Sequence, residues 1–236
     1  MKTDQTKLRI VITGGSSGIG EAIAFNMAKD GHKLYLIGRN QQKLLKVKEQ
    51  IEKVGSEVYV GIGDVSDEYD GKRILNDILN EFGGVDVLVA NAGIGYFGNL
   101  EDLTLTQFDE QFNTNVRGVF IWLKQVLPLM KKKNKGQIIV TSSNLGLNTS
   151  SRASIYSATK HAVQAMVWCL RKELKGTQVK AATINPGSVD TPWFDGKDVD
   201  RTKMLSPIDV ANAARLIILQ KDTSNIDHVL LLPGKN

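Results

Sequence analysis

The feature that most constrains the fold of this chain is a glycine-rich segment, Thr13-Gly14-Gly15-Ser16-Ser17-Gly18-Ile19-Gly20. Residues 8–12 before it are apolar and rich in β-branched side chains, which indicates a strand. Residues 21–28 after it place apolar side chains at 23, 24, 27 and 28, which is the spacing of one helix face. The chain therefore passes from a strand through a glycine turn into a helix.

The start of that helix is a candidate phosphate site. The first amides of a helix have no partner within it, and the helix dipole makes this end positive. Glycines would leave the approach to the backbone open, whereas the alternative is a tight turn that binds no ligand. The residues of this candidate site are Gly14, Ser16, Ser17, Gly18, Ile19 and Gly20.

A second group of polar side chains follows the strand expected over residues 136–141. Ser142 and Ser143 stand at its carboxyl end, where open α/β sheets bind ligands. Tyr156 and Lys160 then lie four residues apart on an expected helix, and so share one face. A nearby ammonium favours the phenolate and would lower the tyrosine pKa from about 10 toward neutrality. An ordinary tyrosine–lysine pair on a surface helix is the alternative.

The motifs follow one another in a fixed order over residues 8 to 192: Thr13-Gly14-x-x-x-Gly18-x-Gly20, Asn91-Ala92-Gly93, Asn115, Ser143, Tyr156-x-x-x-Lys160 and Pro186-Gly187. This series resembles the short-chain dehydrogenase/reductase family, in particular its NADP-preferring carbonyl and 3-oxoacyl reductases. The resemblance implies that Tyr156 exchanges a proton with the substrate oxygen and that Ser143 hydrogen-bonds this oxygen. It also implies that Lys160 holds the nicotinamide ribose and lowers the tyrosine pKa.

Two assignments depend on the family pattern. The family serine precedes the tyrosine by 13 residues, which selects Ser143, and strand alternation turns Ser142 to the other face. The family Asn-x-x-Gly pattern selects Asn115 over Asn113, and implies that Asn115 holds a water linking Lys160 to solvent. A buried amide that repairs an irregular helix is a second reading of Asn115, compatible with the first.

The choice of coenzyme depends on the end of the strand expected over residues 33–38. NAD-selective enzymes usually place a carboxylate there, whereas a 2′-phosphate needs a cation. This chain has Gly38 followed by Arg39, so we expect NADP(H), with NAD(H) as the alternative. An exposed Arg39 without a phosphate contact is the other possibility, and the glycine loop lacks the basic residue of many NADP-dependent relatives.

The resemblance also assigns the remaining coenzyme contacts. Asp64 and Val65 would bound the adenine, and Asn91, Ala92 and Gly93 would line its ribose. Near the nicotinamide it places Pro186, Gly187, Val189 and Thr191.

The substrate pocket is expected between the catalytic residues and a short lid that follows Thr191. Besides Ser143 and Tyr156, Trp193 and Leu145 are the candidate lining residues, with Phe194 and Tyr96 beside them. These aromatic side chains would suit an apolar carbonyl compound, or would equally pack the lid onto its own domain.

The chain alternates strand-like and helix-like segments over 236 residues with 42% hydrophobic content. This pattern predicts an α/β fold: one doubly wound Rossmann-type parallel sheet flanked by helices, spanning 8–236, after a disordered polar segment 1–7. No signal-length or membrane-length apolar stretch occurs, so we expect a cytoplasmic protein that binds no membrane. The single cysteine, Cys169, excludes an internal disulfide and is assigned to helix packing; we expect no metal.

A net charge of +5 includes the compact basic run 131–135, yet no aromatic residue lies within it. The run is better explained as the end of a helix expected over 106–130, so we expect no nucleic-acid partner. This helix and the one carrying Tyr156 have more apolar side chains than one sheet face requires, Phe120 and Trp168 among them. A homodimer or homotetramer is expected.

The sequence thus indicates an NADP-dependent oxidoreductase acting on a small carbonyl compound or secondary alcohol, with Tyr156 as general acid or base. The alternative is a regulatory protein of the same fold that binds NADP without turnover. A methyltransferase with a similar glycine loop would give no reason for Tyr156-x-x-x-Lys160.

Overall fold

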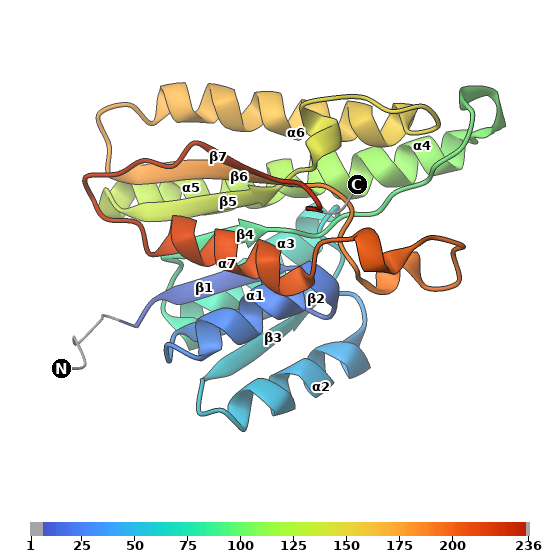
Figure 1. Ribbon diagram of the computed structural model, residues 1–236. Coiled ribbons are helices and arrows are strands. Elements are labelled where there is room, and N and C mark those ends of the chain that lie inside the picture. Colours follow the sequence, from blue (N-terminus) through green and yellow to red (C-terminus); the bar gives the residue numbers. More distant parts are fainter. Residues whose placement is uncertain (1–6, 235–236) are drawn as a thin grey trace.

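The computed structural model describes residues 7–234, in which a central sheet is covered by helices on both faces (Figure 1). The segment expected to be disordered, 1–7, lies outside the described residues except for Lys7. The strands are β1 (Arg9–Thr13), β2 (Lys33–Gly38), β3 (Val58–Ile62), β4 (Val87–Ala90), β5 (Gly136–Thr141), β6 (Val179–Pro186) and β7 (His228–Leu231).

The sheet of the described residues has seven strands in the order β3-β2-β1-β4-β5-β6-β7, and every pairing is parallel. The chain moves outward in one direction from β1 to β3 and in the other from β4 to β7, so the strand order reverses between β1 and β4. This arrangement confirms the predicted doubly wound Rossmann-type fold. A crevice at the carboxyl ends of β1 and β4 follows from that reversal.

The helices are divided between the two faces of the sheet. The longer ones are α1 (Gly18–Ala28), α2 (Gln41–Glu52), α3 (Glu68–Asp77), α4 (Leu105–Phe112), α5 (Gly118–Lys133), α6 (Ser154–Glu173) and α7 (Pro207–Ile218). Short 3-10 helices are η2 (Leu100–Asp102), η4 (Asn144–Gly146), η5 (Pro192–Phe194) and η6 (Arg201–Lys203), and two π-helical turns are η1 (Ile78–Phe82) and η3 (Asn113–Arg117). None of the helices in residues 7–234 combines the length and apolarity needed to span a bilayer.

The two cores follow from strand alternation. Ile10 and Ile12 of β1 pack with α1, α2 and α7, whereas Val11 between them packs with α3, α5 and α6. Strands covered on both faces consist of continuous β-branched and aliphatic residues, which explains the uninterrupted apolar runs in the sequence.

Two expected helices have different ends in the structure. The helix expected over 106–130 is divided into α4, the π-turn η3 and α5, and η3 contains Asn115. The apolar positions 44, 47, 51 and 54 predict a second helix over residues 41–54, but α2 ends at Glu52, and Val54 beyond it is 58% exposed. The spacing of apolar residues reveals neither the π-helical turn between α4 and α5 nor the residue at which α2 ends.

The basic run at 131–133 forms the last turn of α5, and Asn134 ends it in the left-handed conformation. The lysine charges thus complement the negative end of the helix dipole. The assignment of Cys169 to helix packing was wrong, because this thiol is exposed on α6.

Candidate active site

A cleft of about 920 Å³ lies at the carboxyl ends of the strands, across the reversal between β1 and β4. Most residues selected from the sequence line it, although their segments are far apart along the chain. Those lining residues are Gly14, Ser16, Ser17, Gly18, Ile19, Arg39, Asp64, Val65, Asn91, Ala92, Gly93, Tyr96, Ser143, Leu145, Tyr156, Lys160, Pro186, Gly187, Val189, Thr191, Trp193 and Phe194. Gly20 and Asn115 lie behind the lining.

The glycine loop is fixed to the neighbouring strand end. The Thr13 hydroxyl accepts hydrogen bonds from the amides of Asn91 (2.9 Å) and Ala92 (3.1 Å), and the Asn91 side chain donates back to the Thr13 carbonyl at 3.2 Å. Gly14 and Gly18 have φ of +67° and +58°, which favours glycine at both positions. The loop is therefore held in a shape that side chains would not permit.

Gly20 has a different role from the one expected. A Cβ at this position would lie 2.3 Å from the Gly14 carbonyl oxygen and 2.7 Å from the Asn91 amide nitrogen. The absence of a side chain thus lets the first turn of α1 pack on the loop itself.

The N-terminus of α1 faces this cleft without a side-chain cap. Ser17 at the N-cap is extended, with φ of −169°, and its hydroxyl accepts no hydrogen bond from the helix. Ser17 thus leaves the first amides of α1 uncapped, which suits an anion such as a pyrophosphate, and the side chain of Glu21 in the first turn is the acidic group near the Gly18 amide.

Arg39 and Asp64 lie together at the end of the cleft formed by β2 and β3. The guanidinium of Arg39 is 3.7 Å from a carboxylate oxygen of Asp64, and both side chains are solvent-exposed. The other carboxylate oxygen of Asp64 accepts from the amide and the hydroxyl of Ser66 at 2.8 and 2.7 Å. The cation expected to hold a phosphate therefore has a carboxylate neighbour in this structure.

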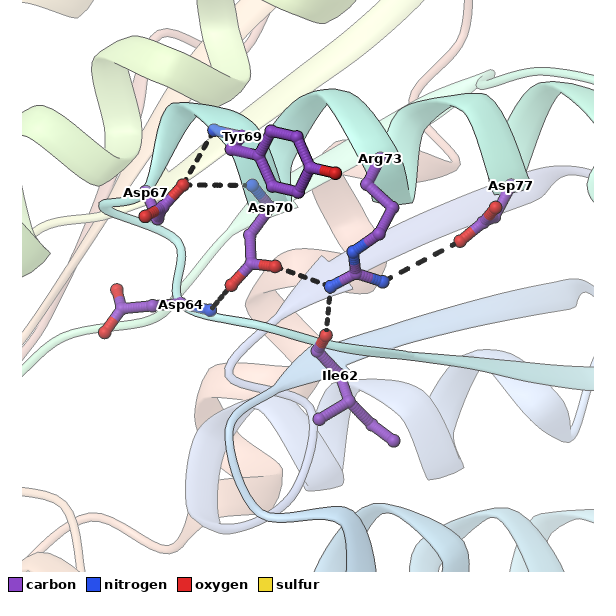
Figure 2. Close-up of polar contacts among 7 residues, drawn as sticks. All are labelled: Ile62, Asp64, Asp67, Tyr69, Asp70, Arg73 and Asp77. Atoms are coloured by element: carbon purple, nitrogen blue, oxygen red, sulfur yellow. Dashed lines mark hydrogen bonds and ion pairs between the residues drawn. The ribbon is translucent and has the colours of Figure 1, made fainter.

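Side chains at the start of α3 fasten the turn that carries Asp64 (Figure 2). Asp70 accepts from the Asp64 amide at 2.9 Å and also binds Arg73, which donates to the Ile62 carbonyl at 2.7 Å. Asp67 caps α3 by accepting from the Asp70 amide at 3.0 Å. This network was not predicted from the sequence, although the spacing of three between Asp70 and Arg73 on a helix is a visible signal.

Tyr156 lies under two aromatic rings from distant segments. Its ring centroid is 5.1 Å from that of Phe97 and 5.9 Å from that of Trp193. Burial raises the pKa of Tyr156 to about 12, and the Ser143 hydroxyl acts in the opposite direction with a smaller effect. This result is the reverse of the lowered pKa that the sequence analysis expected, because the loss of solvent around the phenol outweighs the neighbouring polar groups.

Lys160 is buried on the same face of α6, with 5% of its surface exposed. Its ammonium donates to the Thr141 carbonyl at 3.0 Å and lies 5.6 Å from the centroid of the Tyr156 ring. Burial lowers the pKa of Lys160 from 10.5 to about 8. The ammonium is held beside the phenol by a strand end and not by a carboxylate.

The two serines at the end of β5 have separate partners. The hydroxyl of Ser142 donates to the Lys160 carbonyl at 3.2 Å and so anchors α6. The hydroxyl of Ser143 accepts from the Leu145 amide at 3.1 Å, and the Asn185 amide group holds the Ser143 carbonyl at 3.1 Å. Of the two, Ser143 is the one whose hydroxyl is next to Tyr156.

Asn115 joins three segments from behind the cleft. Its side chain binds both the amide and the carbonyl of Ile94, each at 2.8 Å, and donates to the Thr159 hydroxyl at 3.0 Å. A Cβ on Gly93 would lie 3.2 Å from the Asn115 oxygen and 3.6 Å from the Lys160 ammonium. Gly93 therefore keeps a small polar space open between Asn115 and Lys160.

The lid after β6 closes over the cleft. A Cβ at Gly18 would lie 3.1 Å from Thr191, and one at Gly95 would lie 2.5 Å from the Trp193 ring. Arg201 holds the lid in this shape: it pairs with Asp190, lies 2.9 Å from Asp195 and donates to the Thr191 carbonyl at 3.1 Å. Trp193 and Phe194 therefore contact the cleft and also pack within the lid, so both sequence readings apply.

Gly95, Phe97 and Lys197 are among the cleft residues that were not predicted from the sequence. No local motif marks Phe97 or Lys197, whereas Gly95 two residues after Gly93 is a weak signal of close packing. Within residues 7–234, His, Cys, Asp and Glu side chains form no group of three or more that could hold a metal ion.

Comparison with known proteins agrees with this geometry. A model of the short chain dehydrogenase family matches residues 8–201. An uncharacterised oxidoreductase of Staphylococcus epidermidis is 33% identical over 223 residues, which are 94% of this chain and 96% of that protein. An uncharacterised oxidoreductase of Staphylococcus aureus is 32% identical over the same length.

Solved structures are similar over nearly the whole chain. An alcohol dehydrogenase from the archaeon Thermococcus sibiricus, complexed with 5-hydroxy-NADP, has 33% identity and a TM-score of 0.91, covering 98% of each chain. A 3-ketoacyl-(acyl-carrier-protein) reductase from Brucella melitensis, complexed with NADH, has 27% identity and a TM-score of 0.89, covering 97% of this chain and 98% of its own. The chain therefore belongs to the short-chain dehydrogenase family of oxidoreductases.

Proposed function

We propose that this protein transfers a hydride between NADP(H) and a carbonyl compound or secondary alcohol. The observation that carries the proposal is that Tyr156 and Lys160 face one cleft, whose other end is formed by the glycine loop and the uncapped N-terminus of α1. A proton donor, a buried ammonium and an anion site are the groups such a reaction needs from the protein.

The lining residues fit the coenzyme. The main chain of Gly14 and Gly18 and the first amides of α1 would hold the pyrophosphate, and Lys160 would hold the nicotinamide ribose. Asp64 and Val65 would bound the adenine. When bound, the nicotinamide supplies or accepts the hydride.

Tyr156 would move the proton. Because its pKa is about 12, the phenol is protonated at neutral pH and can donate to the oxygen of a carbonyl undergoing reduction. The hydroxyl of Ser143 would hydrogen-bond that oxygen, and the Lys160 ammonium would stabilise the phenolate that remains. Oxidation would need the phenolate at the outset, so the protonated phenol is the form that serves reduction.

Asn115 would complete a proton relay. The space beside Gly93, between the Asn115 oxygen and the Lys160 ammonium, is polar on two sides. A water held there would connect Lys160 to solvent and return the proton that the phenol loses. The hydrogen bonds of Asn115 to Ile94 and Thr159 also hold the irregular helix η3 in place, so both sequence readings of this residue have support.

Turnover of carbonyl compounds, measured as loss of NADPH absorbance in the near ultraviolet, tests the proposal, with Tyr156→Phe as the decisive variant. We expect the wild-type protein to reduce at least one compound of a broad panel and the variant to lose about 100-fold to 10,000-fold in kcat. Tight NADPH binding without turnover of any compound would instead identify a regulatory protein.

The preference for NADP over NAD depends on Arg39. Its position at the end of β2, exposed and without a carboxylate at Gly38, supports a contact with a 2′-phosphate. Asp64 is close enough to compete for the guanidinium, which would moderate the preference. The solved relatives include complexes with NADP-type coenzymes as well as with NADH.

Self-association is proposed from the outer surface of α5 and α6. Phe120 is 51% exposed and Trp168 is 45% exposed, whereas Trp122 of the same helix pair is buried against the sheet. Exposed rings of this size suit a second copy of the chain. Light scattering at micromolar concentration should give a dimer or tetramer, and a monomer would contradict this proposal.

A further inference from the structure

Lys197 stands among three aromatic rings at the mouth of the cleft. Its ammonium lies 5.4 Å from the centroid of Phe194, 5.7 Å from that of Trp193 and 5.9 Å from that of Phe97. Rings at this distance attract the charge and replace part of its water. Lys197 is therefore an exposed residue whose ammonium lies against rings that line the cleft.

The same rings connect Lys197 to the reacting phenol. Phe97 and Trp193 are the two rings that cover Tyr156, at 5.1 and 5.9 Å between centroids. Lys197 and Tyr156 both line the cleft and share these two neighbours. A substrate whose carbonyl reaches the phenol can therefore extend past these two rings toward the ammonium.

The charges around the cleft leave this ammonium without a counter-ion. Four charged side chains line the cleft in the described structure, and the one carboxylate among them, Asp64, is beside Arg39 at the far end. In the lid, Asp190 and Asp195 are both taken by Arg201. Among residues 7–234, Lys197 has no carboxylate within 4.0 Å. The part of the described cleft near Tyr156 is thus positively charged and has no carboxylate in its lining.

We propose that the substrate is a short oxo acid, or the corresponding hydroxy acid, whose carboxylate binds Lys197 while its carbonyl meets Tyr156 and Ser143. The apolar chain between the two groups would lie against Phe97 and Trp193. This inference rests on the proposed function and names the substrate class of that site. A charge-assisted hydrogen bond to an ammonium partly shielded by rings is stronger than one to a fully hydrated lysine.

The test compares short oxo acids with their methyl esters, which keep the carbonyl and the chain but lose the charge. For the acids, Lys197→Met should raise KM by about tenfold with kcat changed less than about twofold, and Lys197→Arg should restore most of the affinity. For the esters, both parameters should stay within about twofold. Lys203→Met, which removes an exposed lysine of the same lid, should leave the acid KM unchanged.

Three results would overturn the inference while leaving the proposed function intact. One is an equal effect of Lys197→Met on acids and esters, because the lysine would then only shape the lid. Another is an equal effect of Lys203→Met, because general surface charge would be responsible. The third is weaker NADPH binding by Lys197→Met, since the ammonium would then contact the coenzyme. Absence of turnover of acids, esters and neutral ketones by the wild-type protein would remove both proposals.

Discussion

The two ends of the cleft are built in different ways. At the end near β1 and α1, the surface is main chain: positive-φ glycines, uncapped amides and a loop fixed by Thr13 and Asn91. At the end near α6 and the lid, the surface is side chain: a phenol, a buried ammonium and aromatic rings from three segments. Chemistry at the first end depends on the absence of side chains, whereas chemistry at the second depends on how side chains are desolvated.

This contrast explains which parts of the site were accessible from sequence. Glycines that are required by backbone geometry are visible as a motif, and the loop residues selected from it line the cleft except for Gly20. Tyr156 and Lys160 were also found, since a helix fixes which of its residues share a face. The fold was predicted for a similar reason, because a buried parallel sheet leaves continuous apolar runs in the sequence.

Properties that depend on contacts between distant segments could not be predicted from the sequence. The pKa of Tyr156 was predicted in the wrong direction because burial by Phe97 and Trp193 depends on two loops that no local pattern connects. The division of the long helix at Asn115 depends on its bonds to Ile94 and Thr159. Lys197 was missed because the sequence does not show that three rings surround its ammonium. It also does not show that the nearby carboxylates pair with Arg201.

The largest effect on activity is expected from Lys160→Met, at the end of the cleft near α6. Loss of the ammonium should lower kcat/KM for carbonyl reduction by at least about 100-fold, because the phenolate formed in the reaction loses its stabilising charge. Steady-state kinetics with Lys172→Met, an exposed lysine on the same helix, gives the control. Activity within tenfold of the wild type would show that Lys160 does not support Tyr156.

The variant Lys160→Met should also differ from the wild type in the pH dependence of its stability. Burial holds the pKa of Lys160 at about 8, against 10.5 in the unfolded chain, so between these values unfolding takes up a proton and the free energy of unfolding rises with pH. Below pH 8 the buried charge costs the fold up to about 3 kcal/mol. Lys160→Met should therefore be more stable than the wild type at neutral pH, and its advantage should shrink as the pH rises from 8 to 10.5.

Chemical denaturation at several pH values measures that difference, and the comparison between the two proteins cancels titrations that they share. A stability gap that is independent of pH between 7 and 10.5 would contradict the lowered pKa of Lys160. A loss of stability in Lys160→Met at neutral pH would show that the hydrogen bond to Thr141 is worth more than the charge costs.

The main-chain end should break at Gly20. A Cβ there would lie 2.3 Å from the Gly14 carbonyl oxygen, so Gly20→Ala should cost about 2 kcal/mol of unfolding free energy and disturb NADPH binding. Gly38→Ala is the matched control, since its Cβ would have no neighbour closer than 3.5 Å and should change stability by less than about 0.5 kcal/mol. Equal effects of the two substitutions in thermal unfolding would refute the packing role of Gly20.

The smallest effect is expected for Arg39, the exposed residue that follows β2. Arg39→Ser should raise the Kd for NADPH by about tenfold and change that for NADH by less than about twofold, because only NADPH carries the 2′-phosphate. Fluorescence titration with both coenzymes measures this, and Lys29→Ser controls for net charge. The same loss for both coenzymes would mean that Arg39 does not distinguish them.

The network behind Asp64 has a consequence for how coenzyme choice can change. Asp70 and Arg73 lie on the outer surface of α3, yet they hold the amide of Asp64 and the last carbonyl of β3 (Figure 2). A substitution of Asp70 or Arg73 would move the Asp64 carboxylate relative to Arg39 without replacing any residue that lines the cleft. The coenzyme preference proposed for Arg39 would then change through substitutions made outside the cleft.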